Sequence, residues 1–242
     1  MKYHAVFISD LHLGTQNCKE KELLEFLKNV QTDNLYLVGD IIDGWAMSRK
    51  HYWTKTQTEI LRRILKLSEK CNVYYIAGNH DQFIRPFFKY DFQFGRTQIC
   101  DSVVHVGVDG RRVYVTHGDH FDFWMRVPKK LINFFAHITD LPFMAEKRKV
   151  TNQRYLRQTS TEKTVIRYAK LKGYDGVLCG HTHFPKMTDF YMNDGDWTRH
   201  CSYITEDFEG QWELKYYGRY DCQVAKKDAK DVSKDVDKIS KR

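Results

Sequence analysis

The chain has 242 residues, of which 42% are hydrophobic, so it can bury one substantial core, and one domain with an insertion is favoured over two domains. Its formal net charge of +8 at pH 7 favours an anionic partner, such as a phosphate ester, a nucleic acid or an acidic membrane surface. The apolar stretch at the N-terminus ends at Ile8, which is too short for the core of a signal peptide or for a membrane-spanning helix. The six cysteines are scattered without a Cys-x-x-Cys pair. We therefore expect a cytoplasmic protein with reduced, mostly buried thiols.

Short apolar runs alternate with helical patterns through most of the chain. Helical spacing marks one face with Leu23, Leu27 and Val30 and another with Ile60 and Ile64. The runs are rich in Val, Ile and Tyr and bounded by Gly, Asp or Asn, and they predict buried strands at 3–8, 35–38, 73–77, 113–116 and 177–179. This alternation predicts a largely parallel sheet covered by helices.

The C-terminal part has a different pattern. Runs at 188–192, 202–204 and 212–217, separated by turn residues, predict successive antiparallel strands. The predicted fold is an α/β sandwich of two packed sheets flanked by helices, forming a single domain over residues 1–224. Residues 225–242 lack apolar periodicity and predict a charged, disordered tail.

A segment of about fifty residues, 121–172, interrupts this rhythm. Its first half is aromatic, beginning with Phe123 and Trp124, and its second half is basic, including Arg154 and Arg157. We interpret it as a helical cap over the site, with these four residues as candidate substrate contacts. The alternative is a helical hairpin that buries its own aromatic side chains against the body.

Polar motifs follow five of the predicted strands. Each is weak alone, because Asp, Asn and His are common in turns. Together they supply carboxylate, imidazole and carboxamide ligands at the ends of strands, enough for two divalent metals. The candidate residues are Asp10, His12, Asp40, Asn79, His80, His117, His181 and His183, and a further Gly-Asp-Trp motif contains Asp196. Asp43, Asp81, Asp119 and Asp122 could orient the histidine rings or could be ordinary turn residues.

The order Asp-x-His, Gly-Asp, Gly-Asn-His-Asp, His-Gly-Asp and Gly-His-x-His resembles the calcineurin-like metallophosphoesterase superfamily from Asp10 to His183. The resemblance implies that Asp10, His12, Asp40 and His183 hold one metal. It implies that Asp40, Asn79, His117 and His181 hold the other, with Asp40 bridging. His80 would then stabilise the transition state or protonate the leaving oxygen.

Within the superfamily, the motifs and the aromatic-basic insertion resemble the UDP-2,3-diacylglucosamine pyrophosphatase group of lipid A synthesis. The best-known members of that group carry Arg where this chain has His80. The resemblance implies hydrolysis of a nucleotide-diphosphate lipid to UMP and a lipid phosphate, with Asn79 also near the substrate and with peripheral contact to the inner leaflet. It favours two Mn²⁺ ions, and the hard or borderline ligands also suit Fe²⁺ or Zn²⁺.

Two other functions compete with this one. A phosphodiesterase or phosphatase could act on a soluble nucleotide or on nucleic acid, but the chain lacks room for the extra domains that nucleases of this superfamily carry. A non-catalytic scaffold of the same fold would have lost metal ligands, whereas all the expected ligands are present.

Overall fold

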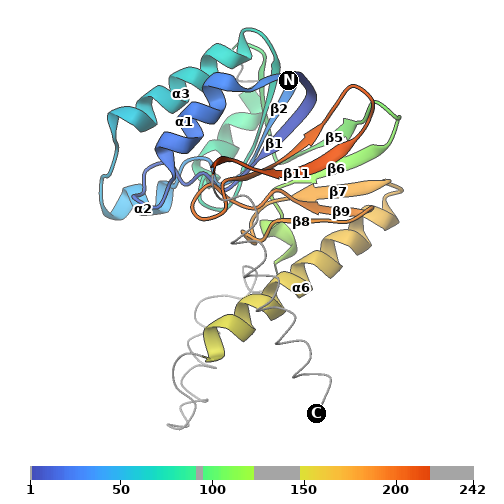
Figure 1. The fold of residues 1–242 in the computed structure, drawn as a ribbon. Helices are drawn as coiled ribbons and strands as arrows, with labels where there is room; N and C mark the ends of the chain where they lie inside the picture. Colours follow the sequence, from blue (N-terminus) through green and yellow to red (C-terminus); the bar gives the residue numbers. More distant parts are fainter. Residues whose placement is uncertain (1, 91–94, 123–147, 219–242) are drawn as a thin grey trace, which may run out of the picture.

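The computed structural model describes residues 2–90, 95–122 and 148–218, and of residues 90 and 148–159 it describes the backbone only. Two sheets pack face to face, and helices cover their outer faces (Figure 1). The predicted two-sheet α/β sandwich is confirmed.

The first sheet has the strand order β11-β10-β1-β2-β3-β4 within the described residues. Strands β1 to β4 run parallel, whereas β10 is antiparallel to both β1 and β11. The bounds are β1 (Lys2–Ile8), β2 (Gln31–Val38), β3 (Asn72–Ile76), β4 (Thr97–Cys100), β10 (Ser202–Glu206) and β11 (Trp212–Tyr216).

The second sheet has the order β5-β6-β7-β9-β8, with β6, β7 and β9 parallel. Its strands are β5 (Ser102–Val106), β6 (Arg112–Thr116), β7 (Gly176–Cys179), β8 (Lys186–Met187) and β9 (Tyr191–Asn193). The predicted antiparallel pair over 202–204 and 212–217 is confirmed as β10 and β11. The predicted strand over 188–192 is wrong in its bounds and its neighbours. Thr188 closes a turn by hydrogen bonding to Tyr191, so the strand β9 begins only at Tyr191, and it lies in the other sheet from β10.

The helices of the described residues are α1 (Glu20–Asn29), α2 (Gly44–Arg49), α3 (Lys55–Ser68) and α6 (Arg148–Leu171), with 3₁₀ segments η1 (Gln82–Tyr90) and η2 (Asp119–Phe121). Helix α3 begins where the Thr54 hydroxyl accepts a hydrogen bond from the amide of Gln57. Helices α1 and α3 cover the first sheet, and α6 packs on the second (Figure 1). None of the described helices has the length and apolarity needed to cross a bilayer.

Strand alternation builds two core layers from β1. Val6 and Ile8 face α1 and α3, whereas Phe7 faces the second sheet and stacks on Tyr36. All three are fully buried, as a sheet covered on both faces requires. The described cysteines are unpaired, and burial raises the pKa of the Cys18 and Cys179 thiols to about 12; Cys222 lies outside the described residues.

Candidate metal centre

Five loops bring the predicted ligands to one edge of the sandwich. Asp10 follows β1, Asp40 follows β2 and Asn79 follows β3, so these three come from the carboxyl ends of neighbouring parallel strands. His117 follows β6, and His181 and His183 follow β7, at the matching edge of the second sheet. Parallel strands end side by side, which is why residues far apart in sequence meet here.

The carboxylates of Asp10 and Asp40 are surrounded by histidine side chains. His183 Nε2 is 3.2 Å from Asp10 Oδ1, and His117 Nε2 is 3.3 Å from Asp40 Oδ2. His12 Nε2 lies between the carboxylates, 3.8 Å from Asp10 and 4.0 Å from Asp40. These atoms form overlapping groups of the size and composition that hold a metal ion.

The second nitrogen of each ring is held by a neighbour. His12 Nδ1 lies 3.1 Å from Asp43 and His183 Nδ1 lies 2.9 Å from Asp196. His117 Nδ1 lies 2.8 Å from the carbonyl oxygen of Val38, to which it can donate. Each contact fixes the ring so that Nε2 is directed toward the carboxylates, as expected for metal-ligating histidines.

His181 has the opposite ring orientation: its Nε2 lies 2.9 Å from Asp122, so a ligand could be bound only through Nδ1. Asp43 and Asp122 therefore contact the candidate ligands directly. Asp81 instead accepts hydrogen bonds from Tyr75 and from the backbone of Ile41 and Gly78, and Asp119 pairs with Arg85.

Several of these residues have a backbone conformation that L-amino acids rarely adopt. Asp10, His12, Asp40, His181 and His183 all have φ between 48° and 64°. Left-handed conformations at non-glycine residues cost free energy and persist where the surroundings require a particular side-chain direction. Five of them at one edge mark it as a functional site.

Glycines allow the loops to approach one another. A Cβ at Gly78 would overlap the side chain and backbone nitrogen of Asp40, and a Cβ at Gly39 would overlap the ring of His117. Only glycine fits at these two positions, because the loop after β2, which carries Asp40, is packed closely against the loops that follow β3 and β6.

The buried carboxylates depend on nearby positive charge. Burial opposes ionisation of Asp40, but the imidazoles of His117, His12 and His80 outweigh it and lower its pKa. Burial likewise opposes charge on His12, yet hydrogen bonding to Asp10 and Asp43 raises its pKa to about 10. The site thus holds its carboxylates ionised and favours cations, whether protons or metal ions.

Fit to a metal can be judged from polar atoms left unsatisfied. Among the described residues, Asp10 Oδ1, His12 Nε2, Asn79 Oδ1 and His117 Nε2 are buried and have no hydrogen-bond partner. Such atoms are costly unless something binds them. All four belong to predicted ligands, and Asp10, His12 and His117 also belong to the clusters of ligating side chains, so the donor set fits a divalent cation.

His80 lies at the rim of this cluster. Its Nδ1 is 2.9 Å from Asp43, its Nε2 is 4.0 Å from Asp40, and its side chain is 25% exposed. Its ring lies 4.5 Å from that of Trp45, which is itself partly exposed. His80 can therefore reach a bound substrate from the solvent side.

Two carboxylates had no assigned role from sequence. Asp196 holds His183, and the signal for it was the Gly-Asp-Trp motif. Asp194 lies 2.7 Å from Ser9, whose hydroxyl donates to Asp10, and burial raises the pKa of Asp194. A protonated Asp194 can donate a hydrogen bond to Ser9, which leaves the Ser9 hydroxyl hydrogen for Asp10. No simple sequence signal indicated this series of hydrogen bonds.

The candidate substrate contacts of the insertion are not placed. Phe123 and Trp124 lie outside the described residues, and so do the side chains of Arg154 and Arg157. The last turns of α6 pack Val165 and Ala169 against the second sheet.

Residues 3–185 match the family model of the calcineurin-like phosphoesterases. The chain belongs to this family. It is 24% identical to a UDP-2,3-diacylglucosamine hydrolase of Aliivibrio fischeri (strain MJ11), over 93% of this chain and 99% of the relative. A Coxiella burnetii (strain Dugway 5J108-111) protein of the same name is also 24% identical, over 88% and 98% of the two chains. A solved structure described as a novel archaeal phosphodiesterase aligns with a TM-score of 0.45 at 16% identity, over 88% of this chain and 98% of its own.

Membership of this family makes the chain a phosphoesterase-type hydrolase, and it indicates that the cluster of carboxylates and imidazoles is a site for divalent metal.

Proposed function

We propose that this protein hydrolyses the diphosphate of UDP-2,3-diacylglucosamine, or of a closely related nucleotide-diphosphate lipid, to UMP and a lipid phosphate. The observation that carries the proposal is the clustering of five predicted ligands, Asp10, His12, Asp40, His117 and His183, three of which have buried atoms without a hydrogen-bond partner in the described residues. The names of relatives matched over nearly their full length support the choice of substrate.

In this proposal Asp10, His12, Asp40 and His183 hold one divalent ion. Asn79, His117 and His181 hold a second ion. Asp40 is shared, because its Oδ2 lies 3.3 Å from His117, a ligand of the second ion, and 4.0 Å from His12, a ligand of the first. Two divalent ions supply an activated water and neutralise the charge of the phosphoryl oxygens. We take Mn²⁺ as the favoured ion because of the family resemblance, and the thiolate-free ligand set also suits Fe²⁺ or Zn²⁺.

The residues of the chain have three tasks in the reaction. Asp43, Asp122 and Asp196 keep the histidine rings in one orientation. The ligand set concentrates positive charge where the diphosphate must bind. His80, held by Asp43 and open to solvent, donates a hydrogen bond or a proton to the oxygen that leaves phosphorus.

An apolar surface beside the cluster favours a substrate that is partly lipid. Trp45 is 43% exposed and Phe83 is 50% exposed, and the ring of Phe83 lies against Gly44, next to Trp45. A small soluble nucleotide would leave this surface unused. The net charge of +8 would also favour contact with an anionic leaflet, where such a lipid resides.

The test is hydrolysis in ¹⁸O-labelled water with UDP-2,3-diacylglucosamine and, in parallel, with a small aryl phosphodiester. Attack on the nucleotide-side phosphorus predicts that UMP carries the label and that the lipid phosphate does not. Label in the lipid phosphate would reverse the orientation of the substrate. Hydrolysis of the aryl diester alone, with no cleavage of the UDP-lipid, would favour the soluble-substrate phosphodiesterase.

A further inference from the structure

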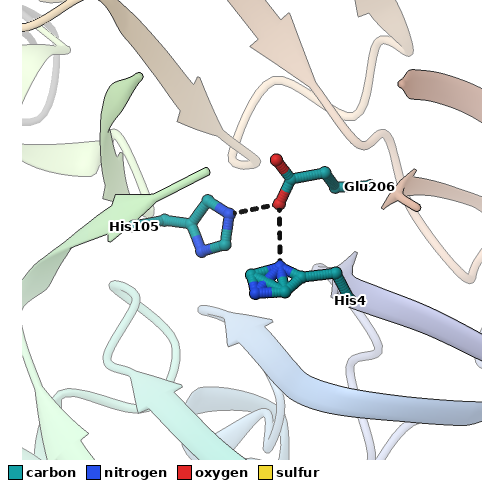
Figure 2. Close-up of side chains that lie close together, drawn as sticks. All are labelled: His4, His105 and Glu206. Carbon is teal, nitrogen blue, oxygen red and sulfur yellow. Dashed lines mark hydrogen bonds and ion pairs between the residues drawn. The ribbon is translucent and has the colours of Figure 1, made fainter. Parts of the chain in front are cut away.

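A second group of ligating side chains lies at the other edge of the sandwich. His4 near the start of β1, His105 on β5 and Glu206 at the end of β10 converge on one oxygen (Figure 2). His4 and Asp10 are six residues apart on and just beyond an extended strand, which corresponds to about 20 Å. The group is therefore separate from the candidate metal centre.

Both imidazoles lie close to Oε2 of Glu206. The distance is 2.7 Å from His105 Nε2 and 3.3 Å from His4 Nδ1. In a tetrahedral zinc site with bonds of about 2.0–2.1 Å, neighbouring ligand atoms lie roughly 3.3 Å apart. The His4 contact already matches, and the His105 contact needs to lengthen by only about half an ångström.

The outer atoms of the two buried ligands are held in place. His105 Nδ1 lies 2.8 Å from the hydroxyl of Tyr36, and burial raises the pKa of that phenol, so Tyr36 remains neutral and can accept the Nδ1 proton. Glu206 Oε1 accepts a hydrogen bond from the amide of Val108. This leaves His105 Nε2 and Glu206 Oε2 for an ion, the arrangement found around metal-ligating side chains.

Charge also favours a cation here. Glu206 is fully buried, and in the described part of the chain its side chain forms hydrogen bonds and ion pairs with two imidazoles and one backbone amide, and no ion pair with Lys or Arg. A buried carboxylate is costly without a compensating positive charge. That charge is either a proton shared with an imidazole or a metal ion bound by all three groups.

We propose that His4, His105 and Glu206 bind a zinc-type divalent ion through one nitrogen each and a single carboxylate oxygen. The His4 side chain remains 23% exposed, which leaves a path for the ion and a position for a water as fourth ligand. β1 and β10 belong to the first sheet and β5 to the second, so the ion links the two sheets. Two imidazoles and one carboxylate suit zinc.

The test compares the wild-type protein with His4→Gln and with His51→Gln, a control that removes an exposed histidine belonging to no ligand group of the described residues. Each protein is stripped with a chelator and dialysed against Zn²⁺, and the bound zinc is measured by mass spectrometry. His4→Gln should bind one zinc fewer per chain than the wild type and His51→Gln, and it should keep the metal-dependent hydrolysis of an aryl phosphodiester.

Equal zinc binding by wild type and His4→Gln would overturn the proposal, and so would an equal loss in His51→Gln. Glu206→Gln provides a second test, since it keeps the shape of the side chain but removes its charge, and it should lose the same zinc. Zinc-edge anomalous diffraction should give a peak among the three residues. A peak at the candidate metal centre alone would refute the site.

Discussion

Asp40 is the residue on which the candidate centre depends most. It is buried, it lies within 4.0 Å of three imidazoles, and its other oxygen accepts a hydrogen bond from the amide of His80. We expect Asp40→Ala to abolish hydrolysis and to reduce bound metal, since two cations would repel each other without the shared carboxylate. Metal content by mass spectrometry and turnover of an aryl phosphodiester check this, with Asp33→Ala as control, since Asp33 is a half-exposed carboxylate that pairs with Lys2. Full metal content with normal turnover would contradict the assignment.

His80 differs from the ligands by its exposure and by its place at the rim. Its removal should leave bound metal unchanged and lower kcat by about 10²–10⁴-fold, the usual contribution of a positioned acid or base. Measuring kcat and metal content of His80→Ala in the same preparation checks this. His80 also falls in a group with His12 and Asp40 that could hold an ion. A loss of metal as large as the loss of activity would make it a ligand.

Asp196 acts through His183. With Asp196→Asn the ring keeps a hydrogen-bond partner but loses the charge beside it, and metal affinity should fall by about 10–100-fold. A metal titration followed by calorimetry measures this. Asp119→Asn is the matched control, because that buried carboxylate pairs with Arg85 and not with a candidate ligand. Equal effects in the two variants would mean that Asp196 has only a structural role.

At the scale of elements, helix α3 buries one of its faces in the core and exposes the other. Ile60 is fully buried between α3 and the first sheet, whereas Leu65 on the same helix is 48% exposed. We expect Ile60→Ala to cost about 2–5 kcal/mol of unfolding free energy. Leu65→Ala should change it by less than about 0.5 kcal/mol. Urea unfolding of both variants measures the difference, and equal costs would show that the helix packs differently.

For the whole molecule, the metal should stabilise the fold as well as the reaction, because its ligands come from both sheets. Mn²⁺ at 100 times its dissociation constant should add about 2.7 kcal/mol. For a chain of this size, that corresponds to a rise of roughly 5–10 °C in Tm. Calorimetric scans with and without Mn²⁺ measure it, and Asp40→Ala should show little of the increase. An identical increase in Asp40→Ala would place the bound ion elsewhere.

The sequence by itself determined the local features. Hydrophobic periodicity is a property of a few neighbouring residues, so β1, β2, β3, β6 and β7 and the faces of α1 and α3 could be predicted from it, whereas the less buried β4 and β5 were missed. The identity of the candidate ligands could also be predicted, because each motif follows a strand directly and the order of the motifs resembles a known family.

Only the tertiary structure decided which groups meet across the chain. The run at 188–192 looked like one strand, but the turn at Thr188 and the assignment of β9 and β10 to different sheets depend on long-range pairing. The partners of Asp43, Asp122 and Asp196 were likewise open until the loops were placed. His4, His105 and Glu206 lie about a hundred residues apart in sequence and share no motif, so their convergence follows solely from the packing of one sheet on the other.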